Sequence, residues 1–347
     1  MRQMKAMLLE GVQDLRRTDA PLVCRTLPVP TPGEREVRIR VTACGVCHTE
    51  LDEIEGRTPP PHFPVIPGHQ VVGRVDACGA GAGRFAHGQR IGVAWIHHAC
   101  QQCRFCREGR ENLCAEFAAT GRDAHGGYAE YMTVHEDFAY PVPDRFSDVQ
   151  AAPLLCAGAI GYRSLALCQL AAGQRLGLTG FGASAHLVIK MVRHQLPDVD
   201  VYVFARSASE QEFALSLGAV WAGDTQATPP HRLDRIIDTT PAWTPVVAAM
   251  RNLTPGGRLV INAIRKESAD QSALLNLDYA VHLWHEKEIK SVANVARSDV
   301  AHFLDLAQRI PILPEVDTFG LEDANRALME LKHRKIRGAK VLVLNRD

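Results

Sequence analysis

The stretch that decides the fold is residues 175–195, RLGLTGFGASAHLVIKMVRHQ. It opens with a short apolar β-type run, continues through the glycine-bearing turn GFGASA, and ends in a helical pattern over 186–195. The turn matches G-x-G-x-x-A, in which Gly180 permits the tight bend, Gly182 lets the backbone approach a pyrophosphate, and Ala185 keeps helix and strand close. Strand, turn and helix in this order predict a dinucleotide-binding unit whose helix N-terminus faces the phosphates.

The sequence around this stretch alternates between the two patterns. We expect strands at 175–179, 200–204, 235–238 and 257–263, and helices at 159–170, 186–195, 208–217 and 244–253. Such alternation is typical of a parallel, doubly wound sheet. The sequence therefore predicts an α/β protein with a Rossmann cofactor-binding domain over residues 158–296.

The residues before this domain follow a different pattern. Up to about residue 157 the chain is rich in Gly, Pro and short β-type runs, such as 36–42, 70–75 and 90–94, which predicts a partly closed β domain with long loops. Beyond residue 297 we expect one further helix and a strand at 339–344. We expect this tail, 297–347, to return to the first domain.

Composition narrows the class of protein. The chain has 347 residues, enough for two domains, and 46% of them are apolar while 22% are charged. The 39 basic and 39 acidic side chains balance, so neither a nucleic-acid groove nor an anionic membrane surface is expected. We find no signal peptide and no apolar run expected to span a bilayer. Ten cysteines without a signal indicate a reducing, cytoplasmic location.

Four cysteines are spaced as C-x2-C-x2-C-x7-C within one loop, CQQCRFCREGRENLC. They are Cys100, Cys103, Cys106 and Cys114. Two-residue gaps let neighbouring thiolates face one centre, so we predict a closed, structural zinc site. Disulfides lack a secretory context here, and ordinary buried thiols are the other alternative. Four further cysteines match no motif and are expected to be small buried hydrophobes: Cys24, Cys44, Cys78 and Cys168.

The end of the second predicted Rossmann strand indicates which nicotinamide is used. An NAD site usually has Asp or Glu there to accept from the ribose hydroxyls, whereas this chain reads Phe204-Ala205-Arg206-Ser207, with no carboxylate until Glu210. Arg206 could pair with a 2′-phosphate, and Ser207 could donate to it. We therefore favour NADP(H), with NAD(H) as the alternative.

Three short motifs carry candidate ligands for a catalytic metal. They are GVCHTEL at 45–51, PGHQVVG at 67–73 and AAPLLCAG at 151–158. Cys47, His69 and Cys156 would form a Cys2His set, which leaves zinc a fourth position for water or substrate. Sequence distance alone does not show that the three residues converge.

Together, these motifs, the cysteine loop and the glycine turn resemble the zinc-dependent alcohol dehydrogenases of the medium-chain dehydrogenase/reductase superfamily. The resemblance covers essentially the whole chain and is nearest to the bacterial and yeast type that prefers short primary alcohols such as propanol. It implies a GroES-like catalytic domain beside the Rossmann domain, two zinc ions per chain, and a homodimer or homotetramer. It also implies reversible hydride transfer between a primary alcohol or aldehyde and NAD(P)(H) through a zinc-bound alkoxide.

The resemblance also assigns roles to residues. Cys47, His69 and Cys156 match the catalytic zinc ligands, and the four-cysteine loop matches the structural zinc site. Thr49 matches the hydroxyl that takes the proton from the alcohol. His48 falls where the family contacts the cofactor pyrophosphate, with a surface histidine as the alternative. Trp95 falls where an aromatic residue lines the substrate pocket, with a packed core residue as the alternative.

Three positions depart from the family pattern. Glu50 stands where an outer-sphere Asp is usual, one methylene longer, and could still support a zinc ligand. Gln70 stands where a Glu able to visit the zinc is usual, which puts such ligand exchange in doubt. Asp52 stands where the terminal histidine of the proton relay is usual; its carboxylate could do that job, or protons could leave through water.

The substrate is the least constrained property. Where yeast-like enzymes carry bulky tryptophans this chain has Ile54 and Thr58, so we expect a wider pocket that accepts medium-length or benzylic primary alcohols as well as ethanol or propanol. A polyol or cinnamyl-type dehydrogenase of the same superfamily is the alternative. A non-enzymatic relative is disfavoured, because such relatives generally lack the catalytic zinc ligands that this chain keeps.

Overall fold

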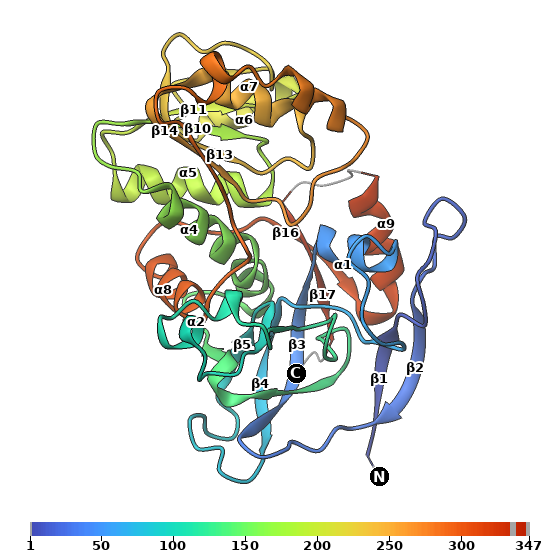
Figure 1. Cartoon of the computed structure of the whole chain (residues 1–347). Coiled ribbons are helices and arrows are strands. Elements are labelled where there is room, and N and C mark those ends of the chain that lie inside the picture. The colour runs from blue at the N-terminus through green and yellow to red at the C-terminus, as the bar shows by residue number, and fades with distance from the viewer. Residues whose placement is uncertain (1, 334–337, 345–347) are drawn as a thin grey trace. The chain divides into compact units, whose positions relative to one another are not determined.

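The computed structural model describes residues 2–333 and 338–344, and its contacts divide the chain into two compact units (Figure 1). The first unit comprises Met1–Cys156, Ala296–Gln308 and Leu313–Asp347. The second unit comprises Ala157–Val295 and Arg309–Ile312. The sequence predicted that the whole tail, 297–347, belongs to the first domain, whereas Arg309–Ile312 groups with the second unit.

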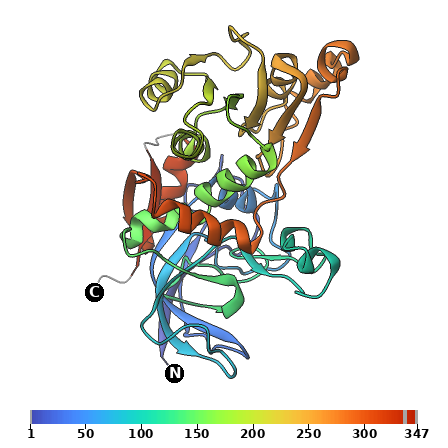
Figure 2. The ribbon, with the colours of Figure 1, turned by 90° about the vertical axis from the view of Figure 1, so that its left-hand side faces the viewer.

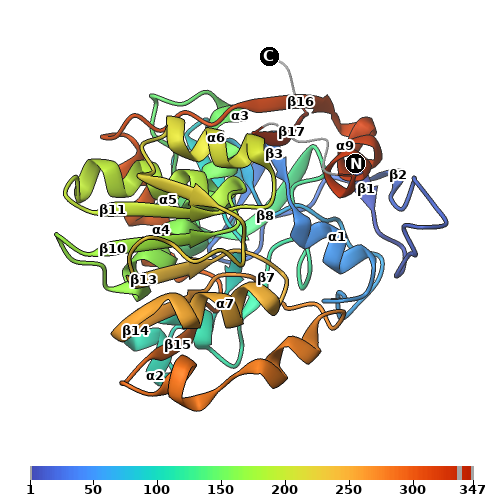
Figure 3. The same ribbon diagram turned by 90° about the horizontal axis from the view of Figure 1, so that it is seen from above.

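The second unit is built on a parallel sheet with the order β12-β11-β10-β13-β14-β15 (Figure 3). Its strands are β10 (Arg175–Thr179), β11 (Asp200–Phe204), β12 (Trp221–Gly223), β13 (Leu233–Asp238), β14 (Leu253–Ile261) and β15 (Glu288–Ser291). The register places Thr179, the last residue of β10, beside Phe204 on one side and Asp238 on the other. The predicted Rossmann fold is confirmed.

The strand order creates a switch point between β10 and β13. The chain runs outward from β10 to β11 and β12, then crosses back to β13 and runs outward the other way. Because such crossovers are right-handed, this reversal puts helices on both faces of the sheet. The helices of this unit are α4 (Ala157–Cys168), α5 (Ala183–Gln195), α6 (Ala208–Ser216) and α7 (Thr244–Asn252). Helix α5 begins three residues before the predicted start, directly after its N-cap Gly182.

The first unit holds a mostly antiparallel sheet with the order β16-β17-β3-β4-β5-β9, and β8 pairs with β3 outside this path. The strands of this unit from the first 100 residues are blue and cyan in Figure 2. The sheet strands are β3 (Glu36–Val46), β4 (Val71–Cys78), β5 (Arg90–Val93), β8 (Tyr131–His135), β9 (Ala139–Pro141), β16 (Val316–Gly320) and β17 (Ala339–Val343). Two smaller ribbons pair β1 (Gln3–Leu8) with β2 (Val23–Pro28) and β6 (Ile96–His98) with β7 (Ala118–Ala119). The carboxyl-terminal strand β17 lies antiparallel to β3.

The helices of the first unit are short. They are α1 (His48–Ile54), α2 (Arg104–Arg107), α3 (Asp148–Ala151), α8 (Arg297–Ala307) and α9 (Ala324–Lys332). The tail thus contains two helices where the sequence predicted one. Helix α9 buries Ala324, Ala327, Leu328 and Leu331 on one side, which is an amphipathic pattern. The helix was not predicted because this pattern extends over only nine residues.

One run passes a test for membrane spans by length and composition. Asp148–Cys168 has 21 residues and a mean hydropathy of 1.4, which is long and apolar enough to cross a membrane by that measure alone. However, 56% of its apolar window is buried inside the protein, as in the core helices of soluble proteins. The run is also broken into α3, a 3-10 turn and α4.

Candidate active site and metal centres

Three separate segments of the first unit bring Cys47, His69 and Cys156 together. Cys47 follows β3 and is the N-cap of α1, His69 directly precedes β4, and Cys156 ends the 3-10 turn Ala152–Leu155. Because β3 and β4 are paired neighbours, the end of one strand and the start of the other lie side by side. The ligand atoms of the three residues all lie within 4.8 Å of one another.

The spacing of these atoms fits a tetrahedral metal. The Sγ atoms of Cys47 and Cys156 are 4.0 Å apart, and His69 Nε2 lies 3.3 Å from Cys156 Sγ. Bonds of about 2.3 Å to sulfur and about 2.0 Å to nitrogen, at tetrahedral angles, predict separations of roughly 3.8 and 3.5 Å. The donor set therefore fits zinc.

Glu50 connects two of these residues from behind. Its carboxylate accepts from the Cys47 backbone N–H at 2.7 Å through Oε2, and its Oε1 lies 2.7 Å from His69 Nδ1. The Glu50 side chain has no exposed surface. A proton held on Nδ1 by this carboxylate leaves Nε2 free to face the two sulfur atoms.

The thiols of this cluster influence one another. The hydrogen bond from Cys156 holds the pKa of Cys47 well below its usual range, although burial works in the opposite direction. The same hydrogen bond, together with burial, raises the pKa of Cys156. A cation bound between the two sulfur atoms would favour the ionised form of both thiols.

The residues that follow Cys47 occupy different environments on α1. Thr49 Oγ1 lies 3.6 Å from Cys47 Sγ, beside the cluster, whereas His48 is exposed at the first position of the helix. Asp52 is buried, and its carboxylate accepts from Arg57 Nε at 2.6 Å. The predicted relay carboxylate is therefore paired with an arginine, a partner that the sequence analysis did not foresee.

The predicted pocket residues are largely enclosed. Trp95 is 8% exposed; its ring centroid lies 5.1 Å from that of Phe117 and 5.3 Å from the Arg122 guanidinium. Ile54 has no exposed surface, and Thr58 is half-buried.

Gln70, the other departure from the family pattern, is buried beside β3. A Cβ atom placed on Gly45 would lie 2.5 Å from Gln70 Oε1. Glycine at position 45 thus leaves the room that the Gln70 side chain occupies.

Glu53 is a buried group that the sequence analysis missed. It lies four residues after Thr49, on the same face of α1, and is 1% exposed. Its Oε1 has no hydrogen-bond partner among the residues that the structure describes, and burial raises its pKa well above the usual range. The i, i+4 spacing from Thr49 was the available signal.

The four-cysteine loop folds into a compact thiol cluster. The ligand atoms of Cys100, Cys103, Cys106 and Cys114 lie within 4.8 Å of one another, and all four cysteines are free thiols. The Sγ separations of Cys106 from Cys100 and Cys103 are 3.9 and 3.6 Å, again the edges of a zinc tetrahedron.

This lobe is also tied to helix α8. Arg297 Nε donates to Glu111 Oε1 at 2.8 Å, and the Arg297 guanidinium lies 5.2 Å from the centroid of the Phe138 ring. Of the four cysteines outside both clusters, Cys44 and Cys168 are buried as predicted. Cys24 and Cys78 are exposed, so the prediction is wrong for them; each lies in or at the end of a strand with one solvent-facing side.

The glycine turn of the second unit has the geometry expected for a phosphate-binding loop. Gly180 has φ +78, and a Cβ there would lie 2.7 Å from Thr239 Oγ1, so both conformation and space require glycine. At Gly182 a Cβ would meet no atom within 4 Å, which leaves open space at the N-terminus of α5. Ala185 is completely buried against the sheet. These residues fit a dinucleotide pyrophosphate.

In the loop after β11, Arg206 and Ser207 were both predicted to contact a 2′-phosphate, and the structure places them in different environments. Arg206 is exposed, and the structure gives it no hydrogen bond or ion pair within the described part of the chain. Ser207 is instead the N-cap of α6: its Oγ accepts from the Glu210 N–H at 3.2 Å and donates to Glu210 Oε2 at 2.9 Å. Its hydroxyl is thus already engaged, which limits the predicted donation to a 2′-phosphate.

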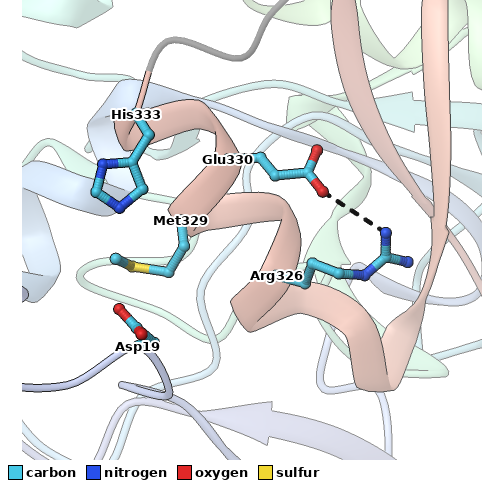
Figure 4. A pocket seen from close by; sticks show the side chains of 5 residues that line it. All are labelled: Asp19, Arg326, Met329, Glu330 and His333. Atoms are coloured by element: carbon cyan, nitrogen blue, oxygen red, sulfur yellow. Dashed lines mark ion pairs between the residues drawn. The ribbon is translucent and has the colours of Figure 1, made fainter.

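One surface hollow is lined by none of the residues of the two cysteine clusters. It measures about 430 Å³ and is lined by Asp19 together with Arg326, Met329, Glu330 and His333 of helix α9 and its end (Figure 4). Arg326 and Glu330 lie four residues apart on α9 and form an ion pair at 3.6 Å. Because none of the candidate ligands lines this hollow, we do not assign it to the chemistry.

A metal-type cluster in a β-rich unit and a phosphate-binding turn in a Rossmann unit define a metal-dependent nicotinamide dehydrogenase. Residues 33–144 match the family model of the alcohol dehydrogenase GroES-like domain. The chain is 42% identical over 329 residues to a probable alcohol dehydrogenase of Mycobacterium tuberculosis, covering 93% of both chains. It is 30% identical over 331 residues to an alcohol dehydrogenase of Geobacillus stearothermophilus, covering 92% of this chain and 94% of that one.

A solved structure gives the same answer. The cinnamyl alcohol dehydrogenase of Sorghum bicolor superposes with a TM-score of 0.80 at 26% identity, over 99% of this chain and 98% of that one. The chain therefore belongs to the zinc-dependent alcohol dehydrogenases of the medium-chain dehydrogenase/reductase superfamily. It is an oxidoreductase with a GroES-like domain, and its family uses zinc and a nicotinamide cofactor.

Proposed function

We propose that this enzyme interconverts primary alcohols and aldehydes with NADP(H) as its preferred cofactor and two zinc ions per chain. The observation that carries the proposal is the convergence of Cys47, His69 and Cys156, with Glu50 behind them. Three protein ligands leave one coordination position for a substrate, whereas the four-thiol cluster leaves none. The first cluster is therefore the catalytic centre and the second holds the structural lobe.

Zinc held by the first cluster would polarise the alcohol oxygen and lower the pKa of its hydroxyl. The role of the chain is to keep the ligand atoms in place. Glu50 holds both the backbone of Cys47 and the ring of His69, so one buried carboxylate orients two of the three ligands. Cys156 approaches from the 3-10 turn Ala152–Leu155 on a separate segment.

Thr49 is the residue we assign to proton transfer. Its hydroxyl lies next to the Cys47 sulfur and can accept a proton from the substrate hydroxyl while donating its own onward. Asp52 lies one turn further along α1, and its carboxylate accepts a hydrogen bond from Arg57 Nε at 2.6 Å. We propose that Asp52 steadies the relay through this pair, and that protons reach solvent from there or through water.

The cofactor assignments follow from the second unit and from His48. The open space beside Gly182 and the N–H groups of α5 would receive the pyrophosphate. His48 is exposed at the start of α1, and the family resemblance supports its role as a contact to the pyrophosphate. Arg206, unpaired within the described residues and carrying the charge that a 2′-phosphate needs, supports the NADP(H) preference. Glu210, bonded to Ser207, limits that preference and is consistent with residual use of NAD(H).

We propose medium-length or benzylic primary alcohols as substrates. Trp95, flanked by Phe117 and Arg122, offers an aromatic wall, and Ile54 and Thr58 are smaller than the tryptophans of yeast-like enzymes. A second candidate is a cinnamyl-type aldehyde reductase. It is favoured by the likeness to the Sorghum bicolor cinnamyl alcohol dehydrogenase.

We further propose that the chain forms a homodimer or homotetramer in the cytoplasm. Edge strand β15 is exposed along its whole length, and so are apolar side chains in this strand and in the segment that precedes it in the sequence: Leu275 (88%), Tyr279 (63%), Trp284 (53%) and Ile289 (44%). An open edge beside an apolar patch is typical of a surface covered by a second copy. The six cysteines of the two clusters need a reducing compartment to remain ligands.

The experiment that tests the proposed function is an alcohol panel with both nicotinamides. The purified enzyme is assayed with ethanol, hexanol, benzyl alcohol, cinnamyl alcohol and a polyol, each with NADP+ and NAD+, by absorbance of the reduced cofactor. We expect the largest kcat/KM with benzyl alcohol or hexanol and NADP+. A steep fall beyond ethanol, or a clear preference for NAD+, would contradict the substrate or cofactor assignment respectively.

A further inference from the structure

A buried lysine is clamped at the switch point of the Rossmann sheet. Lys266 lies in the segment after β14, and its side chain is 8% exposed. Its Nζ donates to the Asp238 carboxylate, to the carbonyl oxygen of Thr240 at 2.7 Å and to that of Ala242 at 3.0 Å. The three acceptors belong to the last residue of β13 and to the loop that follows it. An ammonium group has three N–H donors, and here each has one partner.

Asp238 holds the other side of the clamp. It is the last residue of β13 and has no exposed surface. While one carboxylate oxygen binds Lys266, the other accepts from the Thr240 hydroxyl at 2.8 Å and from the Thr240 N–H at 3.3 Å. A buried charge pair of this kind is expensive to desolvate and contributes little net stability, so its value lies in fixing one arrangement of the backbone.

The clamped loop is directly joined to the glycine turn. Thr239 N–H donates to the carbonyl of Thr179 at 2.9 Å, and Thr239 Oγ1 donates to the carbonyls of Thr179 and Gly180 at 3.0 and 3.3 Å. The segment that carries the lysine is attached too, since Glu267 N–H donates to the Pro241 carbonyl at 2.7 Å. The loops after β10, β13 and β14 thus form one hydrogen-bonded edge.

This edge is where a doubly wound sheet binds its ligand. The chain reverses direction between β10 and β13, and ligands bind at the carboxyl ends of the strands at such a point. Thr179, Gly180, Asp238 and Thr239 are the residues at that point. We propose that Lys266 is a positioning residue for the cofactor: through Asp238 and the 240–242 carbonyls it holds the β13 loop in the conformation that receives the dinucleotide. The inference rests on the proposed cofactor site.

The test compares Lys266→Met with a matched lysine elsewhere in the same unit. Lys287 Nζ likewise donates to two carbonyls, those of Met250 and Val281 at 2.9 and 2.8 Å, but it lies just before β15, at the opposite edge of the sheet. The measured quantities are the Kd values of NADPH and NADH by fluorescence titration, KM for the alcohol at saturating cofactor, Tm, and amide hydrogen exchange of residues 239–243.

For Lys266→Met we expect both Kd values to rise about tenfold, the scale of one displaced contact. We also expect KM for the alcohol to change less than twofold and exchange at 239–243 to accelerate, because only the β13 loop is released. Lys287→Met should leave both Kd values within twofold of the parent enzyme. Equal Kd values for the parent and Lys266→Met, or a rise in both lysine variants alike, would overturn the inference.

A second variant guards against misfolding caused by an unpaired buried Asp238. Asp238→Asn combined with Lys266→Gln removes both charges, and Gln is too short to reach all three acceptors. This double variant should regain most of the parent Tm yet keep a raised Kd; parent-like Kd values would overturn the inference. If the parent enzyme bound neither nicotinamide, the proposed cofactor site itself would fail, and the role of Lys266 with it.

Discussion

Replacing Glu50 by Gln should weaken the catalytic zinc site specifically. The Glu50 carboxylate accepts from the Cys47 N–H through Oε2 and pairs with His69 Nδ1 through Oε1, each at 2.7 Å, and its side chain is fully buried. Glutamine offers only one oxygen, so its NH2 group must face one of these two donors. One charge-assisted hydrogen bond is lost, worth about 1.5–3 kcal/mol, and the remaining donor is left unpaired.

That loss corresponds to a decrease in zinc affinity of roughly 10- to 150-fold, in line with the effect of outer-sphere changes at other zinc sites. The assay is chelator competition with a colorimetric zinc indicator, which resolves the two zinc ions by their release rates. We expect the catalytic ion to leave faster in Glu50→Gln while the ion of the four-cysteine loop leaves at the parent rate.

A matched control is available on the same helix. Glu55 follows α1 and bonds Arg57 and Lys332 but touches no ligand residue, so Glu55→Gln removes the same charge without disturbing the site. Its zinc release should equal that of the parent enzyme. If Glu50→Gln also released zinc at the parent rate, the assignment of Glu50 as the support of Cys47 and His69 would be refuted.

Three further predictions concern cofactor binding and stability. Arg206→Ala should lower kcat/KM for NADP+ by roughly 10- to 150-fold, the loss of one charge-assisted contact, with little change for NAD+; equal losses with both cofactors would argue against a 2′-phosphate contact. Gly182→Ala should leave Tm unchanged, because the added methyl group meets no atom within 4 Å, but it should raise the cofactor Kd at least tenfold. Gly180→Ala should lower the free energy of unfolding by about 1–3 kcal/mol in denaturant unfolding, because the residue has a positive φ. A Gly180→Ala enzyme as stable as the parent would contradict this geometry. Burial works to raise the pKa of Glu136, but the N–H groups of Arg84 and Gly83 and the Arg35 guanidinium lower this pKa overall from 4.5. The contribution of Glu136 to stability is therefore present above pH 4.5 and is lost as the pH falls through the lowered pKa. Glu136→Gln should make stability depend less on pH in this acid range, and an unchanged pH dependence would show that other carboxyls dominate.

Periodicity predicted the second unit well because its buried strands read as short apolar runs. The runs 175–179 and 200–204 coincide with β10 and β11 in the structure. Strand β15 was missed because its sequence, EIKS, is that of an exposed edge, with no apolar face to leave a pattern. The nine-residue helix α9 was missed because its pattern is too short to separate from a loop.

The site was predictable only where a motif is local. The four-cysteine spacing predicts a metal site and the glycine turn predicts a phosphate-binding loop, each from a few neighbouring residues. In the structure the four thiols lie close together and the turn has the expected geometry. The capping box Ser207-x-x-Glu210 was equally readable and would have shown that the Ser207 hydroxyl is engaged. In contrast, the pair of Asp238 with Lys266 joins residues 28 positions apart, and no local pattern reveals which lysine a fold will bury.

The catalytic cluster lies between these cases. Cys47, His69 and Cys156 lie on three segments spread over more than 100 residues, and only the resemblance to a family linked them before the structure did. Asp52 shows the limit of such transfer. Its position matches a relay residue, but its neighbour Arg57 gives it a partner that the family pattern does not contain.

The central claim is that this cluster holds a zinc ion that the reaction requires, separate from the ion of the four-cysteine loop. The most direct test is the zinc content of the purified parent enzyme and of Cys156→Ser, measured by elemental analysis alongside alcohol-dependent reduction of NADP+. We predict two zinc ions per chain in the parent enzyme, and one zinc ion with no measurable turnover in the variant. Unchanged zinc content and unchanged turnover in Cys156→Ser would contradict the account.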